Sequence, residues 1–539
     1  MKLVLIQPPI QDFYQTRERL QPLGLAYLKG AVKKYLPGVE VVIKDFHQGR
    51  GKNKLPLPEE LAYLEEYYPY PDQSPFSLFH PYYHFGASFE IVARETAAEN
   101  PDLVGISALF SPYYREVLRC AEAIKSKTHC PMVLGGSHVS AVPEMMLAHE
   151  AVDWVIRGEG ERPLVELIRA LESGGDWKPV PGLGYKEEGR MVLNPIGESF
   201  PLNEIPLPDF SDLDQRAYRL GKRPLCFILF SRGCPHHCSF CSVHCTFPGY
   251  RRRPVNEVFK EIESRYQEGY RVFDFEDDNL THDRQGFLEL CRLLVQRFPP
   301  GEIELLAMNG ISYHDLEGDL LSWMKKAGFS SLNLSLVTAD PVIGRKNLRP
   351  RSLEKFRDIV NHAHRLGFKL VSYQILGLPG EPLSSMIHTL LLNTRLPVLL
   401  GASPFYLNPG SPLARTFPPP SPVDLIRSRL SAMAVETDHF SREDIYTLFI
   451  ITRIINFFKG LSFPKNSTPL REAIEAAGNK GERSALGVEI FQRLLEEGRL
   501  YATTREGLKP LPRFKPVLFR DLWSKLDCIV TREGKTIEK

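Results

Sequence analysis

Three cysteines stand close together near the middle of the chain, directly after a short apolar run. Cys234, Cys238 and Cys241 are separated by three and then two residues, and they follow the run Leu225–Phe230. A short apolar run predicts a buried strand, so the cysteines fall at the carboxyl end of a strand. Three thiolates on one loop can bind three irons of a [4Fe-4S] cluster and leave the fourth iron open for a small molecule.

A zinc site is the main alternative for these thiols. Zinc normally takes four ligands, often from two cysteine pairs, and the sequence has no second pair. Cys245 is the one nearby candidate for a fourth ligand, but a free cysteine is usually a small buried hydrophobe. The sequence therefore favours the cluster.

The motif resembles the cluster loop of the radical S-adenosylmethionine (SAM) superfamily. That loop reads Cys-x3-Cys-x2-Cys with an aromatic residue before the last cysteine, and this residue is Phe240 here. The resemblance implies that SAM binds the open iron and that one electron cleaves it to methionine and a 5′-deoxyadenosyl radical. It also implies a low-potential electron donor such as a flavodoxin or a ferredoxin.

Length and charge limit the remaining classes. A chain of 539 residues suggests about three domains, and 67 basic against 65 acidic residues indicate no nucleic-acid partner. Nine cysteines without a disulfide framework indicate a reducing, cytoplasmic setting. The start of the chain has no signal-peptide pattern, and the most apolar stretch, 446–463, is too interrupted for a transmembrane segment. We expect a buried helix there.

The first third alternates short apolar runs with helical patterns, which predicts an α/β fold with a Rossmann-like, doubly wound parallel sheet. Ligands of such sheets bind at the carboxyl ends of the strands, where glycine lets backbone approach a ligand closely. Loops that contain small residues follow three of the predicted strands. Their candidate ligand-binding residues are Ser107 and Leu109 after the third strand, Gly135, Gly136 and Ser137 after the fourth, and Gly158 and Gly160 after the fifth.

These loops, in this order, resemble the cobalamin-binding domain found ahead of many radical SAM cores. The resemblance implies that they line the channel for the nucleotide tail of cobalamin. The wider fold often supplies a histidine to cobalt after its first strand, whereas this first strand leads to Gln7-Pro8-Pro9-Ile10. His47 follows the second strand and is predicted to be an ordinary loop histidine. We therefore expect a cobalamin whose lower face lacks a histidine ligand.

The pattern divides the chain into four segments. Residues 1–177 are predicted to form the cobalamin-binding-like domain, with a Pro- and Tyr-rich insert at 51–86 that packs over the sheet or, alternatively, caps the corrin or the substrate. Residues 178–222 form a hairpin and linker, and 223–415 form the radical SAM core. Residues 416–539 form a mostly helical region that is expected to recognise the substrate.

Strand and helix alternate six times from the cluster strand onward, which predicts a partial (β/α)6 barrel, the core that the resemblance also implies. Arg251–Arg253 could be either a solvated cap or a substrate clamp, and Glu381 is predicted to cap a helix. The resemblance implies SAM contacts near the strand ends. These residues are Phe240, Glu276, Asp277, Asp278, Asn309, Ser335, Ile375 and Gly377.

Together these features predict an enzyme with a [4Fe-4S] cluster, SAM and cobalamin as cofactors. The resemblance implies methylation of an unactivated carbon in a small molecule, a lipid or a peptide. Cyclisation or oxidative rearrangement with the same cofactors is the first alternative, and a non-catalytic cluster or cobalamin-binding protein is the second. A methylthiotransferase is disfavoured, because it needs a second three-cysteine cluster and only Cys120 and Cys130 precede residue 200. The pattern assigns no catalytic acid, base or nucleophile.

Overall fold

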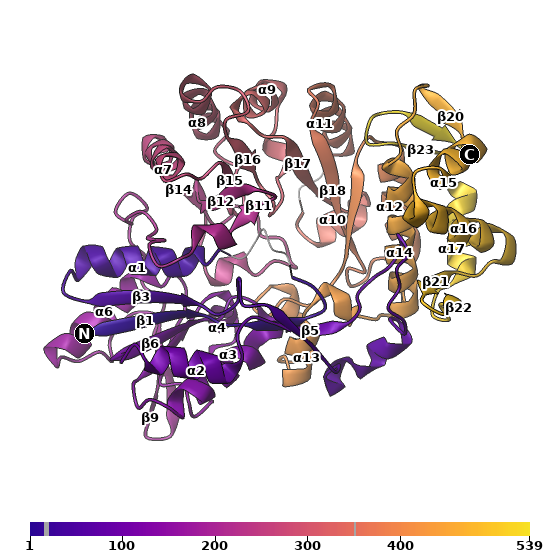
Figure 1. Ribbon diagram of the computed structural model, residues 1–539. Coiled ribbons are helices and arrows are strands. Elements are labelled where there is room, and N and C mark those ends of the chain that lie inside the picture. Colours follow the sequence, from indigo (N-terminus) through magenta and orange to yellow (C-terminus); the bar gives the residue numbers. More distant parts are fainter. Residues whose placement is uncertain (16–20, 350–351) are drawn as a thin grey trace. The chain divides into compact units, whose positions relative to one another are not determined.

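The computed structural model describes residues 1–15, 21–349 and 352–539 (Figure 1). The chain divides into two compact units, and each is assembled from three separate stretches of sequence. The domains predicted from the sequence are continuous segments of the chain, and their bounds stay a prediction. Unit 1 comprises Met1–Pro56, Tyr82–Asp278 and Asn408–Ile426, and unit 2 comprises Leu57–Pro81, Asn279–Leu407 and Arg427–Lys539.

Unit 1 is built on a seven-stranded sheet with the order β10-β9-β8-β7-β6-β1-β3. Along the stretch β8-β7-β6-β1-β3 of this order, each strand is parallel to the next, as a doubly wound sheet requires. The chain leaves β1 for β3 on one side and reaches β6 on the other, which places a topological switch point beside β1. These parallel strands are β1 (Lys2–Gln7), β3 (Glu40–Asp45), β6 (Leu103–Ser107), β7 (Met132–Gly135) and β8 (Trp154–Ile156).

Helices cover both faces of this sheet, which confirms the predicted doubly wound fold (Figure 1). One face is covered by α1 (Leu23–Tyr35) and α6 (Glu161–Ser173), and the other by α2 (Phe89–Ala97) and α3 (Tyr114–Lys125). Strands that are buried on both faces read as continuous apolar runs, and Leu3–Ile6 of β1 are almost fully buried.

An antiparallel hairpin extends the same sheet beyond β8. Its strands are β9 (Leu183–Glu187), which pairs with β8, and β10 (Arg190–Leu193). The hairpin falls where the sequence predicts one.

The second part of unit 1 carries the cluster loop. Strand β12 (Arg223–Ile228) pairs in parallel with β15 (Val272–Phe275), and α7 (Val255–Gln267) connects them. Two short strands, β13 (Ser231–Arg232) and β14 (Arg251–Arg252), pair antiparallel between β12 and α7. The three cysteines therefore lie on the connection that leaves β13.

Unit 2 continues the alternation of strand and helix. Its parallel strands β17 (Ser331–Val337), β18 (Lys369–Leu376) and β19 (Leu399–Pro404) are joined through α11 (Leu353–Arg365) and α12 (Leu383–Thr394). All six strands predicted from the cluster strand onward are present in order, whereas their closure into one partial barrel stays a prediction. The remaining elements before β17 are α8 (Arg284–Arg297), β16 (Glu304–Leu306) and α9 (Gly318–Ala327).

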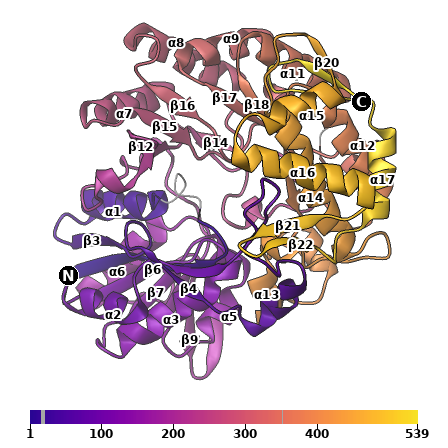
Figure 2. The same ribbon diagram turned by 45° about the vertical axis from the view of Figure 1, so that its right-hand side comes forward.

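The last stretch of unit 2 is mostly helical, as predicted (Figure 2). Its longest helix covers the edge of β19, because the Asn456 side chain bonds both the N–H and the carbonyl of Leu400, as a neighbouring strand would. In the described part of the chain, no helix is long and apolar enough to cross a membrane. The helices are α14 (Arg442–Lys459), α15 (Leu470–Gly478), α16 (Glu482–Glu497) and α17 (Pro516–Lys525).

The central part of the Pro- and Tyr-rich insert packs within unit 2. Residues 57–81 belong to this unit, where Tyr67 and Tyr68 contact Tyr446 of α14 and Phe76 contacts Phe457. Aromatic side chains bury large apolar surfaces, and α14 offers matching rings. This part of the insert therefore packs against a helix that is distant in sequence, and a position over the sheet or the corrin stays a prediction.

Candidate active site at the strand ends of unit 1

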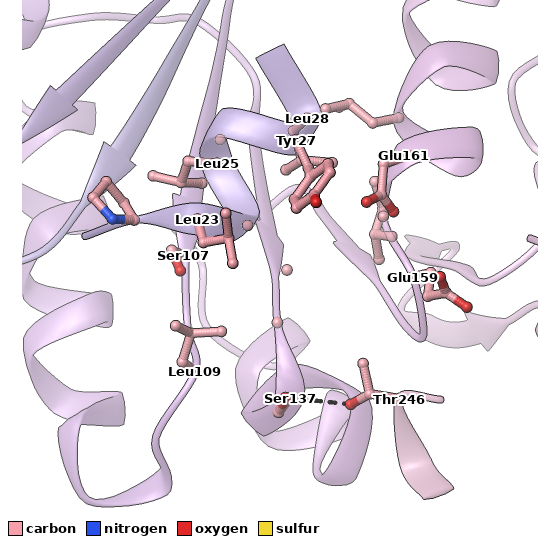
Figure 3. A pocket seen from close by; sticks show the side chains of 18 of the residues that line it. Leu23, Leu25, Tyr27, Leu28, Ser107, Leu109, Ser137, Glu159, Glu161 and Thr246 are labelled. Carbon is pink, nitrogen blue, oxygen red and sulfur yellow. Dashed lines mark hydrogen bonds between the residues drawn. The ribbon is translucent and has the colours of Figure 1, made fainter. Parts of the chain in front are cut away.

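A cavity of about 270 Å³ lies at the carboxyl ends of the parallel strands of unit 1 (Figure 3). The structure brings together around it all seven residues that the sequence proposes for cobalamin. Two of the residues proposed for SAM, Glu276 and Asp278, line the same cavity. The seven are Ser107, Leu109, Gly135, Gly136, Ser137, Gly158 and Gly160.

Gly136 is a position that only glycine can occupy. Its φ is +120°, and a Cβ there would lie 2.6 Å from the carbonyl oxygen of Ala108. The next residue, Ser137, accepts a hydrogen bond of 3.3 Å from the hydroxyl of Thr246, which follows the cluster loop (Figure 3). The loop after β7 thus combines close backbone packing with a direct link to the cluster side of unit 1.

The sequence did not identify the apolar wall of this cavity. Leu23, Leu25 and Leu28 line it from the first turns of α1, together with Tyr27 (Figure 3). The signal was an apolar run at the start of a predicted helix, which is more often ordinary core. A wall of this kind suits a large, mostly apolar ligand.

Gln7 ends β1 and lines the cavity. Among the described residues, its buried side-chain oxygen has no hydrogen-bond partner. His47 is buried and lies outside the lining, where its Nε2 is 3.0 Å from the amide nitrogen of Gln15. Burial lowers the pKa of His47 to about 4. The glycine loops, the apolar wall and the open oxygen of Gln7 fit a corrin with its tail.

The three cysteines share a compact turn. Cys238 is buried, and its carbonyl accepts a 3.1 Å hydrogen bond from the N–H of Cys241. Burial raises the pKa of the Cys241 thiol to about 11. No three Cys, His, Asp or Glu side chains in the described ranges converge on a single metal ion, as zinc would require. In a [4Fe-4S] cluster each thiolate binds a different iron, which suits thiols spread along a loop.

The contacts of Cys245 do not support a role as a fourth ligand. Its thiol donates to the carbonyl of Gly410, with the sulfur 3.1 Å from that oxygen. Burial raises its pKa as well, which favours the neutral thiol. The residue therefore behaves as the small packed thiol that the sequence favours.

Two carboxylates hold the backbone in front of the cysteines. Asp277 is fully buried and accepts hydrogen bonds from the N–H of Phe230, at 3.0 Å, and from both the N–H and the hydroxyl of Ser231. Asp278 accepts a 3.0 Å bond from the N–H of Gly233. Burial raises the pKa of Asp277 to about 7 and that of Asp278 to about 6.

Only glycine fits at position 233. Its φ is +77°, and a Cβ would lie 1.9 Å from the carbonyl oxygen of Gly249. Together with the two aspartates, this contact fixes where the cluster loop begins. Contacts of Glu276, Asp277, Asp278 and the half-buried Phe240 with SAM stay predictions.

The other residues proposed for SAM lie in unit 2. Ser335 and Ile375 are half-buried on neighbouring strands, whereas Asn309 is exposed and Gly377 is buried against Phe440. Their contacts with SAM stay predictions.

Glu381 is fully buried and accepts hydrogen bonds of 3.1 Å from the hydroxyls of Thr338 and Ser385. Ser385 lies in the first turn of α12, so Glu381 contacts the start of that helix through a side chain, whereas a helix cap accepts from a backbone N–H.

Two of the three arginines of the triplet form ion pairs inside unit 1, and contact of the triplet with a substrate stays a prediction. Arg251 pairs with Glu159, and Arg253 is buried with Glu261 at 2.6 Å. Only Arg252 is exposed. Ion pairing inside unit 1 therefore accounts for two of the three side chains.

Family models match two parts of the chain. The model of the radical SAM superfamily matches residues 228–392, and the model of the B12 binding domain matches residues 82–168. The first match contains the cluster loop, and the second contains the loops after β6, β7 and β8. The chain therefore contains a radical SAM domain and a B12-binding domain.

Similar proteins include several methyltransferases. An uncharacterized methyltransferase of Pyrococcus horikoshii is 27% identical over 54% of this chain and 64% of its own length. The cytidylyl-2-hydroxyethylphosphonate methyltransferase of Streptomyces wedmorensis is 24% identical over 71% of this chain and 75% of its own length. The anaerobic magnesium-protoporphyrin IX monomethyl ester cyclase of Cereibacter sphaeroides is 28% identical over 48% of this chain and 44% of its own length.

A solved structure shares the fold. The radical SAM methyltransferase TsrM of Kitasatospora setae, with cobalamin and a [4Fe-4S] cluster bound, has a TM-score of 0.62 and 17% identity. The alignment covers 92% of this chain and 99% of TsrM. At this identity the likeness concerns the fold alone.

Proposed function

We propose that this chain is a cobalamin-dependent radical SAM methyltransferase that acts on an unactivated carbon. One observation carries the proposal: the glycine loops of the B12-binding domain and residues beside the cluster loop, Arg232 and Thr246, line one cavity. A methyl carrier and a radical initiator must meet at one substrate carbon. A shared cavity supports this better than two separate sites would.

The side chains of unit 1 divide the work of binding. Cys234, Cys238 and Cys241 hold the cluster, and Asp277 and Asp278 hold the backbone in front of it. When bound, the cluster and SAM supply a carbon-centred radical, and cobalamin supplies the methyl group. The apolar wall from α1 excludes water from the cavity, which protects a reactive site from side reactions.

The glycine loops admit the corrin tail because they leave room for backbone contact. If a corrin binds in this cavity, Gln7 at the end of β1 would offer it an amide oxygen. Without a histidine ligand, as the sequence predicts, the cobalt would be easier to reduce and to methylate again.

The substrate is a small molecule, a lipid or a peptide, and a low-potential flavodoxin or ferredoxin supplies electrons in the cytoplasm. The mostly helical region 416–539 recognises the substrate. Radical cyclisation without methyl transfer is the second candidate; similarity to the protoporphyrin ester cyclase supports it, but less than the methyltransferase relatives support the first candidate.

Labelled SAM tests the proposal without knowledge of the substrate. The full chain, purified and reconstituted without oxygen, is incubated with cobalamin, a strong reductant and SAM that carries a CD3 methyl group. We expect CD3-cobalamin and S-adenosylhomocysteine in equal amounts, together with slower 5′-deoxyadenosine formation. Formation of 5′-deoxyadenosine without any CD3-cobalamin would favour the cyclase, and no SAM cleavage at all would refute both.

A further inference from the structure

A buried group of charges joins the two sides of the cavity. Arg232 donates from Nη1 to Glu159, at 2.7 Å, and from Nη2 to Glu161, at 2.6 Å. The side chains are 7%, 2% and 8% exposed, so both pairs are withdrawn from water. Arg251 also pairs with Glu159, which leaves two guanidinium groups against two carboxylates. The charge of the group is therefore balanced.

The partners come from the two loops that the cofactors need. Glu159 and Glu161 alternate with Gly158 and Gly160 at the end of β8, and Glu161 begins α6. Arg232 ends β13 and stands two residues before Cys234. One guanidinium thus connects the last glycine loop of the B12-binding domain to the start of the cluster loop.

The guanidinium is also held from its faces. Its central carbon lies 4.9 Å from the ring centre of Tyr27 and 5.9 Å from that of Phe247. Ser199 donates a 2.8 Å hydrogen bond to Glu159 and fixes the orientation of that carboxylate. Figure 3 shows Glu159 and Glu161 at one end of the cavity and Leu23, Leu25 and Leu109 at the other. The polar end of the cavity is therefore a rigid structure.

Burial of such pairs is weak evidence for stability, because the free energy lost when two charges leave water can equal the free energy gained when they pair. A role in geometry explains their position better. Arginine presents a planar fork that bonds two carboxylates at fixed angles, whereas lysine offers a single point of charge. A bond to each loop sets both the spacing and the angle between them.

We propose that Arg232 is a positioning residue that fixes the cluster loop against the Gly158–Glu161 loop and so sets the separation between the cluster and cobalamin. This inference rests on the proposed function of the same cavity. Misplacement of reacting groups by about 1 Å can lower a rate by about 100-fold, so a loosened tie affects methyl transfer strongly. Each cofactor keeps its own ligands and still binds.

Arg232→Lys tests the proposal, and Arg265→Lys is its control. Arg265 is another buried arginine; it lies in α7, pairs with Glu268 and is outside the cavity lining. Both full-length variants are reconstituted with iron, sulfide and cobalamin. Three quantities are measured: iron and cobalt per chain, the magnetic broadening between the reduced cluster and cob(II)alamin in electron paramagnetic resonance, and CD3-cobalamin formation from labelled SAM.

We expect Arg232→Lys to keep both cofactors, to alter the magnetic broadening, and to form CD3-cobalamin about 10- to 100-fold more slowly. Arg265→Lys should match the wild type in all three. Unchanged broadening and an unchanged rate in Arg232→Lys would overturn the inference and leave the proposed function standing. A wild type that forms no CD3-cobalamin would refute the proposed function itself.

Glu161→Gln covers the case in which Arg232→Lys does not fold. This change weakens one of the two pairs and keeps the shape of the side chain. Retained cofactors with altered broadening would support the inference. Loss of either cofactor, or broadening equal to that of the wild type, would overturn it in favour of a purely stabilising role.

Discussion

The two sides of the unit 1 cavity hold their loops by opposite means. On the B12-binding side, the loops after β6, β7 and β8 rely on small residues, and Gly136 closes against the carbonyl of Ala108. On the cluster side, buried carboxylates hold the backbone just before the cysteines: Asp277 bonds the N–H groups of Phe230 and Ser231, and Asp278 bonds that of Gly233. A bulky neutral ligand needs space, whereas three thiolates need a backbone that does not move. The difference predicts that each side can be damaged separately.

The largest effect should come from a cluster ligand. Cys238→Ala removes one of three thiolates, so iron content should fall to a small fraction of about four per chain and 5′-deoxyadenosine formation should fall to background. Iron analysis and product analysis of the reconstituted protein measure this. Cys245→Ala, whose thiol meets the carbonyl of Gly410, should retain both. Equal losses in the two variants would contradict the ligand assignment.

The buried anchor comes next. Asp277→Asn replaces one acceptor oxygen with an NH2 group, which leaves a buried N–H of Phe230 or Ser231 without its bond and should lower the free energy of unfolding by about 2–3 kcal/mol. Urea unfolding measures this loss, and iron uptake should fall while cobalamin binding stays near that of the wild type. The exposed Asp214 provides the control Asp214→Asn, with an expected change below about 0.5 kcal/mol. Loss of cobalamin binding with iron uptake retained would contradict the separate roles of the two sides of the cavity.

The glycine side should show the converse. Gly136→Ala forces an L-residue into φ +120° and against the Ala108 carbonyl, at a cost of about 1–3 kcal/mol. Cobalamin binding, followed by its visible absorbance, should weaken at least about tenfold while iron content is unchanged. Gly174→Ala, at a helix end with φ +64° and open space around it, should cost about 1 kcal/mol and leave cobalamin binding intact.

The smallest expected effect is a loss of folding stability at acid pH. His138 lies in α4 (Ser137–Ala141), the short helix after β7, and burial lowers its pKa to about 4. Below pH 6.5 the unfolded chain takes up a proton that the folded chain refuses, so stability falls as the pH drops from about 6.5 toward 4. Near pH 5.5 this loss is about 1 kcal/mol. His138→Gln should flatten the dependence, and urea unfolding at pH 7.5 and 5.5 compares the two; identical slopes would contradict a buried neutral histidine.

Much of the fold was predictable because its signals are local. Apolar runs announce the parallel strands, and the small residues after β6, β7 and β8 all face one cavity because parallel strands end at the same edge. The cysteine spacing is equally local. The Arg232 pairs were not predictable, because their partners lie 73 and 71 residues away.

Other features depend on which surfaces meet in space. Asp277 stands in a row of polar residues, and that row did not indicate its hydrogen bonds to Phe230 and Ser231; its contact with SAM stays a prediction. The insert at 57–81 joins α14 through aromatic contacts more than 360 residues apart in sequence. No periodicity within the insert indicates that partner.

The most direct test of the account is the cofactor content of one preparation. The full chain, purified without oxygen and reconstituted with iron, sulfide and cobalamin, is analysed for iron and cobalt and by visible absorbance. We predict about four irons and one cobalamin per chain. A chain that binds the cluster but shows no corrin absorbance would contradict the account.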